Sequence, residues 1–270
     1  MSAPPLAWSS LGSSRERLPV RWPQPVTREW AWGGSTGRGV RVCIVDSGIE
    51  PAHPLVGPVD SSHVAVAGED GEVSVVTDEE GDVSGHGTAC GGIVRSIAPE
   101  CELHGVRVLG PDLTGTGKAL LAGLEWAVRQ GFDVINMSLS TRKRAFADVL
   151  RELTDDAYFQ RSLMVCSAHN ATVESFPWRF ASVVSVGSHD RADLLDFDYN
   201  PRGPVEFFGR GTDVEVAWPG GGTTVASGNS FATPQVAGIC ALILAKHPGL
   251  TPFEVKTILY MTASNVGEPG

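Results

Sequence analysis

Four side chains of this sequence have the types and the chain order that nucleophilic catalysis needs. Asp46 follows "RVCIV", His86 stands in "SGHGTACGG", Asn170 follows "MVCSAH", and Ser230 stands in "GNSFATPQVAG". They supply a nucleophilic hydroxyl, a base, a group that orients the base, and an amide donor for an oxyanion. Each one alone has an ordinary explanation, because Asp-Ser-Gly and Asn after a strand are typical of turns. The four together predict a site for nucleophilic catalysis.

Ser230 has a second possible role, because serine is a favoured helix N-cap. The run from Val236 to Ala245 is apolar on nearly every side and ends in "KHPG", which predicts a helix buried all round. At the start of such a helix, unpaired backbone N–H groups and the positive end of the dipole would stabilise an oxyanion. The residues alone therefore leave both roles open, cap and nucleophile.

Alternating strand and helix patterns must position these side chains. The predicted strands cover 40–46, 102–109, 133–140, 163–170 and 183–188, and the predicted helices cover 86–97, 117–130, 146–160 and 251–263. Most strand runs are apolar on both faces, as in parallel strands between helix layers. The pattern predicts a three-layer α/β fold with a doubly wound, mostly parallel sheet flanked by helices. In such sheets ligands bind at the carboxyl ends of the strands, where Asp46 and Asn170 stand.

Four segments resemble the signature blocks of the subtilisin-like serine proteases, the subtilases: "VDSGIE", "GHGTACGG", "INMSLS" and "GNSFATPQVAG". The resemblance extends from about residue 39 to residue 263. It implies that Ser230 is the nucleophile, His86 the general base, Asp46 the residue that orients the imidazole, and Asn170 the side-chain oxyanion donor. The chain order Asp, His, Ser is the subtilisin order, and no G-x-S-x-G elbow of the α/β-hydrolases is present.

The resemblance also implies how substrate binds. Subtilases hold a peptide as an extended strand between two edge segments, which here match Leu113-Thr114-Gly115 and Ser138-Leu139-Ser140. The expected partner is therefore a peptide or protein substrate. Ser140 and His169 replace small glycines at the rim of the primary specificity pocket, so we expect a restricted specificity. Two further departures follow the nucleophile, where Phe231 replaces the usual methionine and Gln235 the usual histidine.

The resemblance divides the chain into an arm and a domain. Residues 1–38 are rich in proline and hold four of the seven tryptophans, and residues 39–270 form the subtilisin-like peptidase domain. We expect the arm to pack on the domain through Trp22, Trp30 and Trp32. The alternative is that "RLPV" (17–20) lies across the site as an inhibitory segment.

No cofactor is expected. The calcium loop that many subtilases insert after the helix of the catalytic histidine is missing, because "GGIVRSIAPECELHGV" runs directly to the next strand. A weaker calcium site elsewhere stays open. The five cysteines have neither disulfide nor zinc spacing, which predicts reduced, mostly buried thiols and a cytoplasmic location. Cys90 lies four residues after His86 and matches the thiol of the cysteine-containing branch of the family.

Composition excludes two partner classes. The chain carries 31 acidic and 21 basic residues, a net charge of −10, without a basic cluster that would bind nucleic acid or anionic lipid. No apolar run approaches a membrane span, and the N-terminus lacks the pattern of a signal peptide. We therefore expect no nucleic-acid partner and no membrane partner. The sequence does not predict an oligomeric state.

The expected function is that of an intracellular serine endopeptidase that hydrolyses peptide bonds by Asp-His-Ser acyl-enzyme catalysis. Restricted specificity suits the processing of a precursor, such as removal of a leader peptide. The alternative is a catalytically silent peptide-binding module that has kept the fold. The intact set of four residues argues against this alternative.

Overall fold

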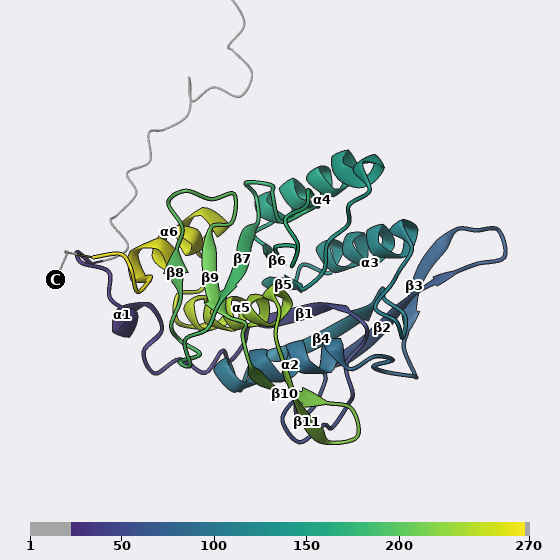
Figure 1. Ribbon diagram of the computed structural model, residues 1–270, viewed down its shortest axis with the longest axis horizontal. Coiled ribbons are helices and arrows are strands. Elements are labelled where there is room, and N and C mark those ends of the chain that lie inside the picture. The colour runs from purple at the N-terminus through teal and green to yellow at the C-terminus, as the bar shows by residue number, and fades with distance from the viewer. Residues whose placement is uncertain (1–22, 268–270) are drawn as a thin grey trace, which may run out of the picture.

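The computed structural model describes residues 23–267 and has a nine-stranded sheet at its centre (Figure 1). Its strands are β1 (Arg41–Asp46), β2 (Ser61–Ala67), β3 (Val73–Thr77), β4 (Glu102–Arg107), β5 (Val134–Met137), β6 (Leu163–Ser167), β7 (Val184–His189), β8 (Asp198–Tyr199) and β9 (Phe207–Arg210). Their order is β3-β2-β4-β1-β5-β6-β7-β9-β8, and only the edge strands β3 and β8 pair antiparallel. β10 (Val214–Trp218) and β11 (Gly222–Ala226) form a separate hairpin.

Helices cover both faces of the sheet. They are α1 (Arg28–Trp32), α2 (His86–Ile97), α3 (Gly117–Arg129), α4 (Ala147–Phe159), α5 (Asn229–Lys246) and α6 (Pro252–Thr262), with a 3-10 turn, η1 (Arg144–Phe146), before α4. α3 and α4 lie on one face, and α2 and α5 lie on the other (Figure 1). The predicted three-layer α/β architecture is confirmed.

Alternation along β1 decides where Asp46 points. Val42 and Ile44 belong to the core on the side of α2 and α5, whereas Cys43 and Val45 belong to the core on the side of α3. Side chains alternate between the faces of a strand. Asp46 therefore points toward α2 and α5, at the carboxyl end of the strand.

Three predicted strands end earlier than expected. The 102–109 strand ends at Arg107, the 133–140 strand at Met137 and the 163–170 strand at Ser167, so 138–140 and 168–170 are loops at the carboxyl edge of the sheet. The hairpin β2–β3 was not predicted, and its burial pattern is a mixture of half-exposed and exposed residues instead of a continuous apolar run. The connection 98–101 between α2 and β4 is as short as the sequence indicates.

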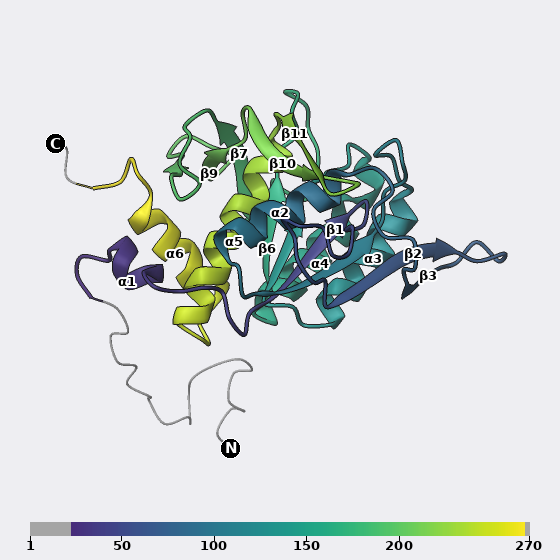
Figure 2. The same ribbon diagram turned by 90° about the horizontal axis from the view of Figure 1, so that it is seen from below.

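The described part of the arm, 23–38, packs on the domain, with α1 beside α6 (Figure 2). Trp32 is 5% exposed, and the ring of Trp30 lies 4.3 Å from the ring of His247. Lys246 Nζ donates to the carbonyl of Gly33 at 2.7 Å. Trp22 and the "RLPV" segment lie outside the described residues.

Candidate active site

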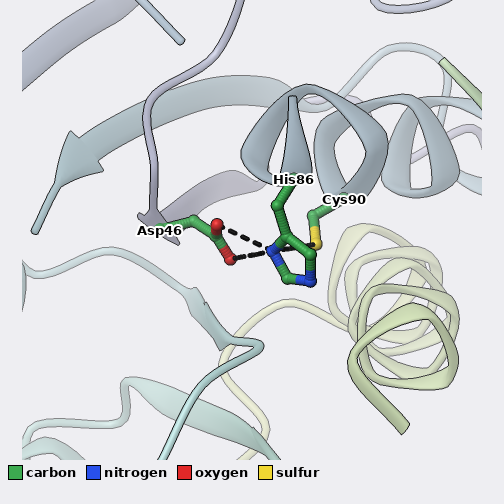
Figure 3. A group of neighbouring side chains, drawn as sticks. All are labelled: Asp46, His86 and Cys90. Carbon is green, nitrogen blue, oxygen red and sulfur yellow. Dashed lines mark hydrogen bonds and ion pairs between the residues drawn. The ribbon is translucent and has the colours of Figure 1, made fainter. Parts of the chain in front are cut away.

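β1 and α2 bring Asp46 and His86 into contact. Asp46 ends β1 and is 0% exposed, and His86 is the first residue of α2 and is 9% exposed. His86 Nδ1 lies 2.8 Å from Oδ1 and 2.9 Å from Oδ2 of Asp46 (Figure 3). The carboxylate thus holds the proton on Nδ1, which leaves Nε2 as the basic nitrogen.

The surroundings of His86 change its basicity. Burial disfavours the imidazolium, but the Asp46 carboxylate and the Cys90 sulfur favour it more strongly, so the pKa of His86 is raised above its ordinary value. A higher pKa makes the neutral imidazole a stronger base. The raised pKa also means that the neutral imidazole of His86, which is the base, becomes the main form only at a higher pH.

Asp82 ties the segments of Asp46 and His86 together. The N-cap of α2 is Gly85, with φ 96° and no capping side chain. The Asp82 carboxylate takes over this role, accepting from the N–H groups of Gly85 and Thr88 at 2.8 Å each and from the Ser47 hydroxyl at 2.8 Å. The N–H of Ser47 donates in turn to Asp46 Oδ1 at 2.8 Å. Asp82 was not among the predicted site residues, because it lies three residues before the N-cap and reaches the helix N–H groups only through the fold of the loop.

Ser230 is the second residue of α5 and the N-cap is Gly228, so Ser230 does not have the alternative role of helix N-cap. Pro234 has no N–H and cannot donate to the carbonyl of Ser230 four residues earlier. Instead the Ser138 hydroxyl donates to that carbonyl at 2.8 Å, and Cys90 Sγ lies 3.7 Å from it. The backbone of the predicted nucleophile is therefore held by side chains from two other elements.

Asn170 and Ser230 face a common space at the start of α5. Asn170 Oδ1 accepts from the N–H of Asn229 at 2.9 Å, which leaves the amide Nδ2 free to donate. Asn170 Nδ2 and Ser230 Oγ each lie 3.3 Å from the point that a Cβ on Gly228 would occupy. The glycine keeps this space open. An oxyanion there would have the Asn170 amide and the first-turn N–H of Ser230 as donors.

His86 and Ser230 lie on facing helices. The ring centroids of His86 and Phe231 are 5.3 Å apart. Within residues 23–267 no hydrogen bond joins His86 to Ser230. Catalytic hydrogen bonds are often long in unliganded enzymes and shorten when substrate binds. The structure thus gathers all four predicted residues at one end of the sheet, and their catalytic roles stay predictions.

Cys90 is a buried neighbour of the Asp46–His86 pair. Its Sγ lies 4.0 Å from both His86 Nδ1 and Asp46 Oδ2 (Figure 3). Burial raises the pKa of this thiol, which disfavours the thiolate needed for nucleophilic attack. The ligand atoms of Asp46, His86 and Cys90 lie within 4.8 Å of one another. A set of one carboxylate oxygen, one imidazole nitrogen and one sulfur suits a transition metal such as zinc better than calcium, which takes oxygen ligands.

A cavity of about 560 Å³ lies beside the site, between residues 108–117 and 139–143. Six of the seven predicted substrate-binding residues line it: Leu113, Thr114, Gly115, Leu139, Ser140 and His169. The exception is Ser138, whose 6% exposed side chain bonds the Ser230 carbonyl instead. His169 also lines a second cavity of about 420 Å³, together with Asn170 and Asn229.

The two departures after the nucleophile are buried. Phe231 packs against the ring of His86, as described above. Gln235 is 0% exposed and bonds the main chain at both ends of its amide, donating to the Asp196 carbonyl at 3.0 Å and accepting from the Arg210 N–H. It therefore fastens α5 to the end of β9.

A serine at the start of a buried helix, an Asp–His pair at the end of a parallel strand and an adjacent asparagine define an α/β serine hydrolase. Comparison with known proteins specifies the class. The model of the subtilase family matches residues 37–270, and this chain belongs to that family. It is a serine-type endopeptidase with a subtilisin-like fold.

The similarity to individual proteins covers most of the chain. Subtilisin DY of Bacillus licheniformis is 32% identical over 250 residues, which are 87% of this chain and 87% of the relative. The subtilisin of Bacillus pumilus is 31% identical over 251 residues, with the same coverage of both chains. A crystal structure of a cold adapted subtilisin-like serine proteinase superposes with a TM-score of 0.69 at 27% identity, covering 86% of each chain. These similarities do not favour the silent binding module.

Asn170→Ala is expected to lower kcat by about 10²–10³-fold, because it removes one donor to the oxyanion. KM should change little, since the amide acts on charge that develops in the transition state. Steady-state kinetics with one chromogenic peptide measure both constants. An unchanged kcat with a raised KM would place Asn170 in substrate binding and contradict the oxyanion role.

Proposed function

We propose that this endopeptidase acts in the cytoplasm on a limited set of peptides, with Asp46, His86 and Ser230 as its triad and Asn170 as oxyanion donor. The expected reaction is acyl transfer to Ser230 followed by hydrolysis. Removal of a leader from a precursor peptide is the biological role that this proposal favours.

The observation that carries the restricted specificity is the position of His169. Its side chain lines both cavities next to Asn170, and its Nδ1 accepts from the N–H of Ala171 at 2.9 Å, which fixes the ring. A fixed imidazole reduces the room for a substrate side chain. Ser140, on the opposite segment of the larger cavity, adds a second side chain where small glycines are usual in the family.

The buried cysteines support the proposed location, and the open cavity supports the kind of substrate. All five cysteines are unpaired and buried, as suits a reducing compartment. Among residues 23–267 no helix combines the length and the apolarity needed to cross a membrane. The open cavity between two chain segments suits an extended peptide that pairs through its main chain.

His169→Gly is expected to raise the relative rate for large aromatic side chains at the residue before the scissile bond. Removing the ring enlarges the pocket, and even one methylene group more or less in a side chain that fills an apolar pocket changes kcat/KM by about 10–200-fold. The measurement is the ratio of kcat/KM for paired peptides with Phe or Ala at that position. An unchanged ratio would show that His169 does not contact this side chain.

Cleavage of a diverse peptide library tests the proposal as a whole. The expected result is efficient cleavage of a small subset of sequences with a shared pattern around the cut. Comparable cleavage of most sequences would contradict the restricted specificity while leaving the endopeptidase class untouched.

A further inference from the structure

We propose that the cavity between residues 108–117 and 139–143 selects peptides with a carboxylate side chain, aspartate or glutamate, a few residues from the scissile bond. The inference rests on the proposed function, because it assumes that the substrate peptide lies in this cavity. It adds a chemical class to the limited set of substrates.

The charges that line the cavity are of one sign. Arg142 and Lys143 are its charged lining residues, and His169 is the other basic group. Among the residues that the structure describes, no aspartate or glutamate belongs to the lining. This local excess of positive charge contrasts with the net charge of −10 of the whole chain. The cavity should therefore attract a negatively charged substrate side chain, although the protein as a whole is acidic.

Arg142 and Lys143 have no ion-pair partner within residues 23–267. The neighbouring cations differ, because Arg144 lies 2.5 Å and Arg179 3.3 Å from the carboxylate of Glu174. Two adjacent unpaired cations repel each other, and a substrate carboxylate would relieve that repulsion.

The acidic residue on the opposite segment is engaged by its own loop. Asp112 Oδ1 accepts from the N–H of Thr114 at 3.2 Å and from its hydroxyl at 2.8 Å. These hydrogen bonds lower the pKa of Asp112, which is thus satisfied without a cation from across the cavity.

The segment that carries Arg142 and Lys143 is anchored at a defined place. The N–H groups of Thr141 and Phe176 each donate to the other residue's carbonyl at 2.9 Å, and the Thr141 hydroxyl accepts from the N–H of Lys143 at 3.2 Å. The same segment begins at Ser138, which contacts the carbonyl of Ser230. Arg142 and Lys143 stand four and five residues after Ser138 in the chain, so we expect them to face substrate residues a few positions from the cut and not the residue next to it.

The test uses paired peptides that differ only by Asp or Asn at one position, with that position moved along an otherwise constant decapeptide. Exposed ion pairs are weak, so the expected Asp/Asn ratio of kcat/KM is about 3–10 at one or two neighbouring positions and near one elsewhere. Raising the salt concentration to about 1 M, where the Debye length is about 3 Å, should reduce the ratio.

Three variants connect the ratio to the two cations. Arg142→Gln combined with Lys143→Gln is expected to bring the Asp/Asn ratio to about one. The exchange Arg142→Lys with Lys143→Arg keeps both charges and should keep the ratio. Arg144→Gln is the matched control, because Arg144 is exposed in the same segment but pairs with Glu174 and does not line the cavity.

Two results would overturn the inference: an Asp/Asn ratio near one at every position, or a ratio that survives the double glutamine variant. The two proposals can also fail separately. If the enzyme cleaves most library peptides but its Asp/Asn ratio still depends on Arg142 and Lys143, the restricted specificity is contradicted and the inference is supported. If no peptide is cleaved, fluorescence anisotropy of labelled decapeptides on Ser230→Ala decides. The inference is supported if Ser230→Ala binds the Asp peptide more tightly than the Asn peptide and the two glutamine substitutions remove this difference. Equal binding of the two peptides refutes it.

Discussion

Ser230→Ala is expected to lower kcat for peptide hydrolysis by about 10⁶-fold and to leave the fold intact. The kinetic loss follows from the removal of the hydroxyl that would attack the scissile carbonyl. The fold should persist because the contacts that anchor this residue involve its main-chain carbonyl, which accepts from Ser138 at 2.8 Å and lies 3.7 Å from Cys90 Sγ. Alanine keeps that carbonyl.

The same loss is expected for His86→Ala, and the double variant should be no worse than either single one. Without the base the hydroxyl is not activated, and without the hydroxyl the base has no proton to accept, so the two losses do not add. The measurement is kcat for the three variants on one peptide, with thermal unfolding as a control for the fold. Losses that multiply in the double variant would show that the two residues act independently.

Labelling with a fluorophosphonate separates this enzyme from a silent module with the same residues. The wild-type protein should be labelled at Ser230, and Ser230→Ala should not be labelled at all. Wild-type protein that is folded but unreactive would contradict the role of Ser230 as an activated nucleophile.

Local chemistry in the sequence was sufficient to predict the main features of the site. The helix predicted over 86–97 has those bounds in the structure, and a glycine in the left-handed conformation stands directly before it. The alternating strands and helices place their polar carboxyl ends at one edge, so Asp46 and Asn170 could be expected near each other. The family resemblance supplied the roles.

Features that depend on contacts between distant segments could not be predicted in this way. Asp82 caps α2 only because the loop before the helix folds back on Ser47, which follows β1. The hydroxyl of Ser138 bonds the Ser230 carbonyl because Pro234 leaves that carbonyl free, and this requires β5 to lie beside α5. The predicted strands also ran past the true ends of β5 and β6, because Ser138 and Ala168 are still buried after the strand pairing ends.

Asp46→Asn is expected to lower kcat by about 10⁴-fold, because it stabilises the wrong tautomer of His86. Here the environment determines how the new amide is oriented. The N–H of Ser47 donates to Oδ1 at 2.8 Å, so an asparagine would keep its oxygen at that position. Both carboxylate oxygens face His86 Nδ1, Oδ1 at 2.8 Å and Oδ2 at 2.9 Å, so the NH₂ group that replaces Oδ2 would oppose a proton on this nitrogen and would donate to its lone pair instead. The imidazole proton would move to Nε2, where a lone pair is needed to accept the proton of Ser230.

The pH profile gives this variant a second readout. In the wild-type protein the Asp46 carboxylate raises the pKa of His86, and catalysis needs the neutral imidazole, so kcat/KM should rise with pH through this raised pKa. Asp46→Asn removes the negative charge, lowers the pKa of His86, and should move that rise to lower pH. Asp78→Asn is a matched control, because Asp78 is a buried carboxylate that pairs with Arg107 at 2.9 Å and makes no contact with His86. An equal shift in both variants would attribute it to a general change in the protein, whereas a shift confined to Asp46→Asn would assign it to the carboxylate beside the base.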